Sequence, residues 1–189
     1  MRSSALRTER GARRVLLVLA CALLGTASSP RAIDVGKSSA QFSVAHIWVE
    51  RVTGTVPILS GGVSLDPGTV IPENVTAVLD ATHITTGEPD RDRSLESPDF
   101  FDAAKFPRWT FTSTRIAATG PVSFEMDGDL TIHGVTQPER LDVTVIGDPA
   151  HPEYRAKAQI DRHAFGMIRT RLDPTIGSTV DVTLDIVLQ

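Results

Sequence analysis

The stretch Val122-Ser123-Phe124-Glu125-Met126-Asp127-Gly128-Asp129-Leu130-Thr131-Ile132 alternates between two kinds of residue without a break. Apolar residues or glycine stand at the even positions, and polar residues stand at the odd ones. Successive side chains of a β-strand point to opposite faces, so this stretch has one apolar and one polar face. Such a strand is typical of an antiparallel sheet with a single buried side. The stretch therefore predicts an all-β fold.

The same period of two residues recurs along the chain. It is clear at residues 40–48 and 179–188, and weaker in five further segments: 52–65, 74–82, 108–117, 139–147 and 154–161. Turns rich in Gly and Pro separate these segments, which gives eight strands in all. A sheet of this size protects its edges either by closing into a barrel or by stacking as two sheets. The periodicity leaves both arrangements open, and a barrel of about eight strands can hold a small ligand.

Residues 85–102 interrupt the alternation. They place charges, two prolines and the pair Phe100-Phe101 in one connection, and connections this long inside a compact domain are uncommon and usually functional. Glu88-Pro89 and Ser97-Pro98 both resemble helix starts with Pro at the first helical position. We expect helix only within residues 88–105, and we interpret the insertion as a lid on a β container.

Residues 1–27 have the pattern of a secretory signal peptide. A basic head with five Arg residues precedes an apolar run at 15–24, and Gly25-Thr26-Ala27 offers small residues for cleavage after Ala27. The run is too short for a membrane span. Arg13-Arg14 leaves the export route open between the Sec and twin-arginine pathways, and Cys21 offers a weaker alternative as a lipidation site. We expect a mature protein in the periplasm or outside the cell.

Cleavage at this point would change the charge and the cysteine content. The formal charge is −4 for the whole chain and becomes −8 once five Arg and one Glu are removed, and Cys21 is the only cysteine. An acidic mature chain argues against nucleic acid as a partner. Without cysteine it has neither disulfide nor thiol chemistry.

Catalytic and metal-binding patterns are missing from the sequence. It contains neither Gly-x-Ser-x-Gly nor His-Glu-x-x-His, and its five His residues lack paired ligand spacing. Asp90-Arg91-Asp92 with His46 is the one set that resembles acid–base machinery, but carboxylates are so plentiful here that chance supplies such sets. We expect no enzyme activity, no metal and no redox cofactor.

Several segments, taken together and in order, resemble the YceI-like family of secreted bacterial proteins. The resemblance covers nearly all of residues 33–189, which we take as one domain. The most specific matches are the Phe-Phe insertion, the run Gly128–Thr136 and the late Phe165-Gly166; the others are 42–46, 53–55, 84–87, 91–92, 95, 97–99, 102, 105–107, 111–114 and 162–164. This chain departs from the family pattern at Ser94, at Glu88 and at Thr55-Val56, and these departures bear on the polar end of a cavity.

The resemblance implies an eight-stranded, lipocalin-like antiparallel barrel that binds a long isoprenoid or another lipid. The residues that we expect to line or contact the ligand are Phe42, His46, Trp48, Thr86, Arg91, Asp92, Phe100, Phe101, Phe111, Phe124, Met126 and Phe165. Each apolar member is also a candidate for ordinary core. Small inner-face residues at Ala40, Gly128, Ala156 and Ala158 favour a ligand, because they leave volume unfilled.

The polar candidates have two interpretations each. An inward His46 can hydrogen-bond a quinone carbonyl, a phosphate or an amide, or it can be a core histidine bonded to the protein itself. Arg91 can pair with an anionic head group that Asp92 orients, or both can tie the insertion to the barrel. Phe100 and Phe101 are adjacent, so we expect one to plug the barrel and the other to line its entrance.

The sequence thus favours a periplasmic carrier that holds one long apolar chain, possibly that of a quinone, inside a barrel. Two alternatives remain. One is a ligand-free structural or stress-related interaction module of the cell envelope, and the other is an enzyme acting on lipid head groups. The identity of the lipid and the oligomeric state, a homodimer included, stay open.

Overall fold

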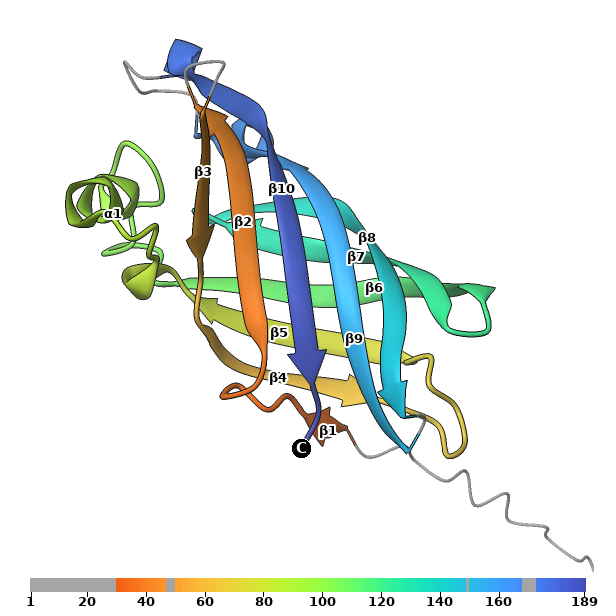
Figure 1. Ribbon diagram of the computed structural model, residues 1–189. Helices are drawn as coiled ribbons and strands as arrows, with labels where there is room; N and C mark the ends of the chain where they lie inside the picture. The colour runs from red at the N-terminus through yellow and green to blue at the C-terminus, as the bar shows by residue number, and fades with distance from the viewer. Residues whose placement is uncertain (1–29, 47–49, 149, 168–172) are drawn as a thin grey trace, which may run out of the picture.

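The computed structural model describes residues 30–46, 50–148, 150–167 and 173–189. The expected signal peptide at 1–27 and the candidate Trp48 lie outside these residues. The described chain forms one antiparallel sheet and one α-helix (Figure 1). The strands are β1 (Arg31–Ala32), β2 (Ser39–His46), β3 (Glu50–Thr55), β4 (Ile58–Ser64), β5 (Asn74–Asp80), β6 (Arg108–Gly120), β7 (Ser123–Ile132), β8 (Val135–Asp148), β9 (His151–Asp161) and β10 (Ile176–Val187).

The sheet has ten strands in the described chain, so the expectation of eight was wrong. Residues 52–65 do not form one strand but divide into β3 and β4 on either side of Val56-Pro57. Pro57 has no backbone N–H with which to continue a ladder, and the chain changes its strand partner there from β2 to β5. The other addition is β1, which is only two residues long and too short to show a period.

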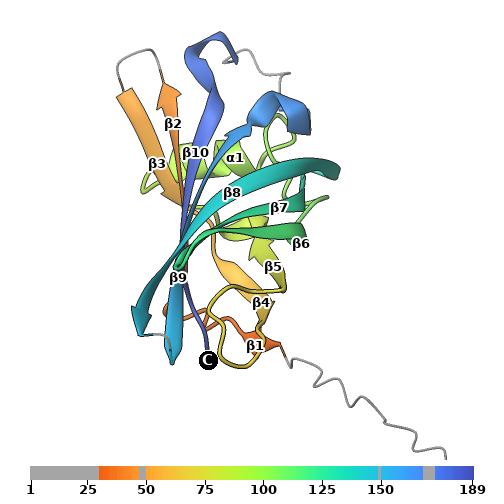
Figure 2. The same ribbon diagram turned by 90° about the vertical axis from the view of Figure 1, so that its right-hand side faces the viewer.

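The strand order is β1-β4-β5-β6-β7-β8-β9-β10-β2-β3, and the sheet curls into a half-barrel. Figure 2 shows β2, β3 and β10 facing β6, β7 and β8 across the interior. The N-terminal segment ties the curled sheet together at one end, because Ile33 pairs with Leu188 and Asp34 N–H donates to the Val187 carbonyl at 2.8 Å. At the turn between β3 and β4, Val56 N–H donates to the Ala40 carbonyl at 3.0 Å.

The insertion folds as one helix, α1 (Pro89–Glu96), which lies beside β3 (Figure 1). Pro89 begins this helix as expected. The second expected start, Ser97-Pro98, was wrong: Ser97 ends α1, and its hydroxyl donates to the Ser94 carbonyl at 2.6 Å. Three short 3₁₀ turns complete the described elements: η1 (Ala81–His83), η2 (Arg162–Phe165) and η3 (Asp173–Thr175). A bridge between Thr55 and Thr85 joins the insertion to the edge of β3.

The core follows the alternation that the sequence predicts. On β7, the even-numbered residues from Phe124 to Ile132 are buried, whereas Asp129 is exposed. Facing outward, Asp127 pairs with Arg140 of β8 at 2.6 Å. The inner face of the curled sheet is therefore mainly apolar, and it encloses the candidate site.

Candidate functional site

The curled sheet encloses a cavity of about 410 Å³. Inner-face residues of most strands line it, including four successive inward positions of β10: Val180, Val182, Leu184 and Ile186. Across the cavity lie the inward residues of β7, Phe124, Met126 and Leu130. The volume falls in the range of known small-molecule sites. The cavity is therefore large enough to admit a ligand, and its walls are mostly hydrocarbon.

Small residues keep part of this volume open. Ala40, Ala156 and Ala158 all line the cavity, as expected from their inner-face positions. Gly128 does not contribute volume, because the ring of Phe111 lies directly over its Cα and a Cβ there would overlap the ring. Phe42 covers Gly54 of the paired strand in the same way. These two glycines serve close packing of aromatic rings, a known device of β-sheets, and both rings also line the cavity.

One end of the cavity is closed by an aromatic pair and a loop. The Tyr154 hydroxyl donates to the Val70 carbonyl in the β4–β5 loop at 3.1 Å, and the ring centroid of Tyr154 lies 6.2 Å from that of Phe124. Burial raises the pKa of Tyr154 to about 12. This hydroxyl therefore stays protonated at physiological pH and keeps donating to Val70.

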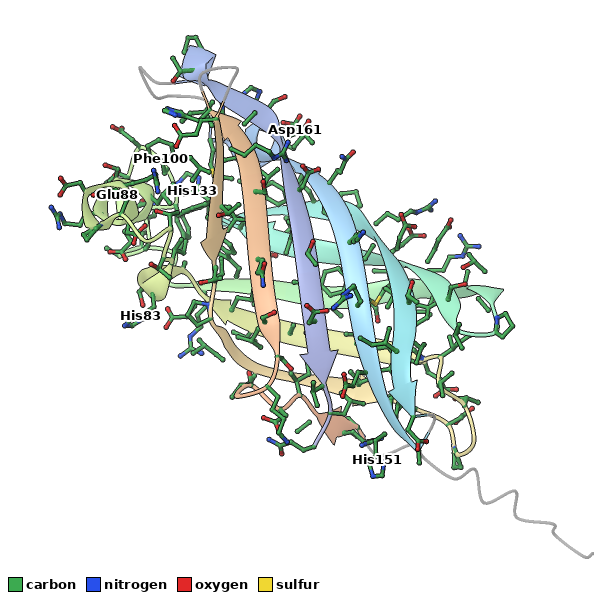
Figure 3. All side chains as sticks on the ribbon, viewed as in Figure 1. His83, Glu88, Phe100, His133, His151 and Asp161 are labelled. Carbon is green, nitrogen blue, oxygen red and sulfur yellow. The ribbon has the colours of Figure 1, made fainter. Side chains whose placement is uncertain are left out.

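The other end, which we call the insertion end, carries the polar lining. Arg91 of α1, His46 at the end of β2 and Phe100 after α1 all line the cavity there. Figure 3 shows Phe100 and Asp161 at this end of the molecule and His151 at the opposite end. His46 is partly exposed, and its imidazole makes no hydrogen bond with any residue that the structure describes. Its imidazole is therefore available to a ligand.

Phe100 and Phe101 both line the cavity, although we expected only one of them to face inward. The chain between α1 and Asp102 is a turn rather than a helix or a strand, so neighbouring side chains need not diverge. Phe101 also packs on Trp109 of β6, with ring centroids 4.7 Å apart. The pair therefore covers the cavity at the insertion end and adds to the core at the same time.

Thr86 and Asp92 form a network inside the insertion and are not among the cavity-lining residues. The Asp92 carboxylate accepts from the Thr86 N–H at 2.8 Å, the Thr86 hydroxyl at 2.5 Å and the Thr85 hydroxyl at 3.1 Å. Arg91 Nε in turn donates to the Thr86 hydroxyl oxygen at 2.8 Å. Burial opposes ionisation of Asp92, but these hydrogen bonds outweigh it and hold its pKa below the usual value.

We expect Asp92→Asn to lower the free energy of unfolding by about 2 kcal/mol, because hydrogen bonds to a charged acceptor contribute about 1.5–3 kcal/mol. A lowered native pKa stabilises the fold above the unfolded-state pKa of about 3.9, and the gain is lost as pH falls through the native pKa. The difference from wild type should therefore be full at pH 7 and shrink below pH 4. Urea unfolding at pH 7 and pH 3.5 measures it.

Asp90→Asn is the matched control for this prediction. Asp90 is an exposed neighbour on α1 whose carboxylate pairs with Arg93 of the same helix. The substitution removes the same charge without touching the Thr86 network. Equal effects of the two substitutions would contradict a structural role for Asp92.

The sequence analysis missed Arg162, which is 5% exposed and lines the cavity. Its guanidinium donates to the carbonyls of Met167, Ile176 at 2.9 Å and Gly177 at 2.9 Å. It thereby joins η2 to the beginning of β10. No local sequence pattern predicts these three contacts, because the acceptors are backbone carbonyls.

The sequence analysis also missed Glu139, although its signal was visible. Glu139 occupies an inward position of β8, two residues before the buried Leu141, and it lines the cavity. Burial raises the pKa of its carboxyl, and the negative charge of Asp161 raises it further. The alternation along β8 places this carboxyl on the inner, apolar face of the sheet, where charged residues are rare.

Phe165 is fully buried but does not line this cavity. It lies instead at a second pocket of about 380 Å³, together with Phe106 and His133. His133 has a positive φ of 53°, and its Nδ1 lies 3.3 Å from the Phe165 carbonyl oxygen. The residues brought together around the main cavity are thus Phe42, His46, Arg91, Phe100, Phe101, Phe111, Phe124 and Met126.

No group of three His, Cys, Asp or Glu side chains lies close enough to hold a metal ion within 30–46, 50–148, 150–167 and 173–189. Over those same ranges, no helix has the length and apolar character needed to cross a bilayer.

An antiparallel half-barrel with an apolar interior and one capping helix defines a lipocalin-like class of protein. The model of the YceI-like domain matches residues 32–188, so the chain belongs to the YceI-like family. A UPF0312 protein of Vibrio parahaemolyticus is 33% identical over 134 residues, which span 69% of this chain and 71% of the relative.

Two solved structures share the fold at low sequence identity. Burkholderia cenocepacia BcnA has a TM-score of 0.76 at 22% identity, covering 83% of this chain and 99% of that protein. A polyisoprenoid binding domain from Saccharophagus degradans, implicated in plant cell wall breakdown, has a TM-score of 0.62 at 18% identity and covers 84% and 97%.

Proposed function

We propose that this protein binds one long-chain isoprenoid or another amphiphilic lipid in the cavity and carries or sequesters it in the bacterial periplasm or outside the cell. The apolar cavity of about 410 Å³ is the observation that carries the proposal. The shared fold with a polyisoprenoid binding domain supports it. The signal-like pattern of residues 1–27 supports the location.

The affinity would come from burying hydrocarbon. Each buried CH₂ group contributes about 0.8 kcal/mol, so about 15 groups contribute roughly 12 kcal/mol. A micromolar dissociation constant needs about 8 kcal/mol. Roughly 4 kcal/mol is then left to offset the loss of ligand freedom on binding. A single chain inside the cavity therefore suffices for useful affinity without any covalent step.

The lipid would enter with its polar group at the insertion end. His46 and Arg91 line the cavity there, and both can hydrogen-bond a carbonyl, a phosphate or an amide. Tyr154 and Phe124 close the opposite end of the cavity. The apolar tail of the lipid would therefore lie at that end. A quinone fits this arrangement as well as an isoprenoid does. We propose no catalytic role.

Native mass spectrometry tests the proposal on protein purified from a bacterial envelope, with lipidomics of whatever it releases. We expect a lipid with a chain of at least twelve carbons to co-purify at one molecule per protein. A mass equal to that of the protein alone, under several growth conditions, would contradict the carrier and favour a ligand-free interaction module.

A further inference from the structure

We propose that Glu139 is a specificity residue, which makes this cavity prefer amphiphiles that carry a hydrogen-bond donor, such as an ammonium or a hydroxyl, over anionic ones. The inference rests on the proposed lipid-binding function and names the chemistry that the site selects. Glu139 is the one acidic residue among the described residues that line the cavity.

The strand register fixes the direction of the Glu139 side chain. Glu139 of β8 pairs with Gly128 of β7, and Leu141 and Val143 are the next inward residues of β8. The neighbouring Arg140 faces outward, where it pairs with Asp127 at 2.6 Å and Glu125 at 3.3 Å. The nearest cation on the same strand is therefore on the other face of the sheet and cannot neutralise Glu139.

The two arginines among the described residues that line the cavity make no ion pair or hydrogen bond with Glu139 and instead bind other parts of the chain. Arg162 donates to three backbone carbonyls, and Arg91 donates to Thr86. Among the residues that the structure describes, the carboxyl of Glu139 has neither an ion pair nor a hydrogen bond. Asp161 is the charged group that acts on it, and it has the same sign.

A carboxyl in these surroundings gains most from a ligand that brings a donor. Removing a charged or polar group from water costs free energy unless a partner satisfies it. An ammonium or a hydroxyl on the ligand supplies that partner, whereas a second carboxylate adds repulsion. The lining position of Glu139 gives the ligand access to its carboxyl, and the ring that covers its strand partner Gly128, that of Phe111, offers it no hydrogen bond.

Matched twelve-carbon ligands test the inference. Dodecylamine, 1-dodecanol and laurate share one chain length and differ in the polar group. The assay measures how strongly each ligand displaces the fluorescent probe N-phenyl-1-naphthylamine at pH 8. It compares the wild-type protein with Glu139→Gln and Glu139→Leu. We expect the ratio of the laurate to the dodecylamine dissociation constant to fall by about 10-fold to 100-fold in Glu139→Leu and by less in Glu139→Gln.

Glu153→Gln is the matched control, because Glu153 is exposed on β9 and the substitution removes the same charge from the outside. It should leave the ratio unchanged. If the Glu139 variants bind the probe like wild type and keep the wild-type ratio within twofold, the inference is overturned and the lipid-binding function stands. If the wild-type protein binds neither the probe nor any of the three chains, the proposed function fails and the inference fails with it.

Discussion

Ala158→Trp should weaken lipid binding by about 100-fold or more and leave the protein folded. Ala158 of β9 is paired with Val182 of the adjacent strand β10, and both residues line the cavity. An indole ring placed there would occupy space that the hydrocarbon chain needs. Exclusion of about four CH₂ groups costs roughly 3 kcal/mol, which corresponds to about a 100-fold loss of affinity.

The fold should survive this substitution because the cavity can accept the added atoms. Overpacking a filled core costs about 1–3 kcal/mol, but Ala158 is only partly buried and borders open volume. Isothermal titration with the lipid identified by mass spectrometry gives the affinity, and circular dichroism gives the melting temperature.

Lys157→Trp provides the control for Ala158→Trp. Lys157 is the next residue of β9, is exposed, and faces the outside of the half-barrel. The same indole ring placed there should leave the affinity unchanged. If Ala158→Trp binds the lipid as tightly as wild type, the lipid does not occupy this cavity.

The sequence predicted the sheet well because a single physical pattern defines it. The inward residues of β7 and β10 are the ones that their alternation indicates. The strand count was wrong where this pattern ran through Pro57, because alternation continues across a proline but the hydrogen-bond ladder does not. Strand pairing depends on contacts between residues far apart in the sequence, and the local alternation of apolar and polar residues does not predict it.

The site was predicted in part, and the errors have a common cause. Phe42, Phe111 and Phe124 were found because their phase on a strand is local information, whereas Trp109 and Tyr154 of the same wall were missed. Gly128 was taken to leave space, although the ring of Phe111 from the adjacent strand fills it. Arg162 was missed because three of the atoms that it binds are backbone carbonyls, which residue type does not reveal. Contacts between strands and turns decide these features, and residue type alone does not.

Thr86 and Asp92 also show that residue type alone does not separate a ligand contact from a structural contact. The sequence left two roles open for Asp92, orienting a head group or tying the insertion to the barrel, and it named Thr86 as a ligand contact. The structure places both residues in a network that holds α1 against the chain before it. Arg91 belongs to that network and to the cavity wall at once. A residue pattern therefore locates a functional region more reliably than it separates ligand contacts from the residues that position them.

Arg162→Met should lower the melting temperature by about 10 °C, the largest stability effect that we expect from a single substitution. Methionine fills a similar volume but donates no hydrogen bond, so the carbonyls of Met167, Ile176 and Gly177 each lose a donor. Each buried acceptor left unsatisfied costs about 1–3 kcal/mol, or at least roughly 3 kcal/mol together. For a domain of this size, 1 kcal/mol shifts the melting temperature by about 2–4 °C.

Two further variants separate charge from geometry in this prediction. Arg162→Lys keeps the charge, but one ammonium lacks the planar fork with which the guanidinium reaches all three carbonyls, so it should recover less than half of the loss. Arg155→Met removes an Arg whose partner Asp185 lies on the outer face of the sheet, and it should change the melting temperature little. A melting temperature of Arg162→Met within 2 °C of wild type would show that the three hydrogen bonds do not hold η2 to β10.

Because Arg162 also lines the cavity, loosening the contact between η2 and β10 should speed lipid release, which stopped-flow displacement measures.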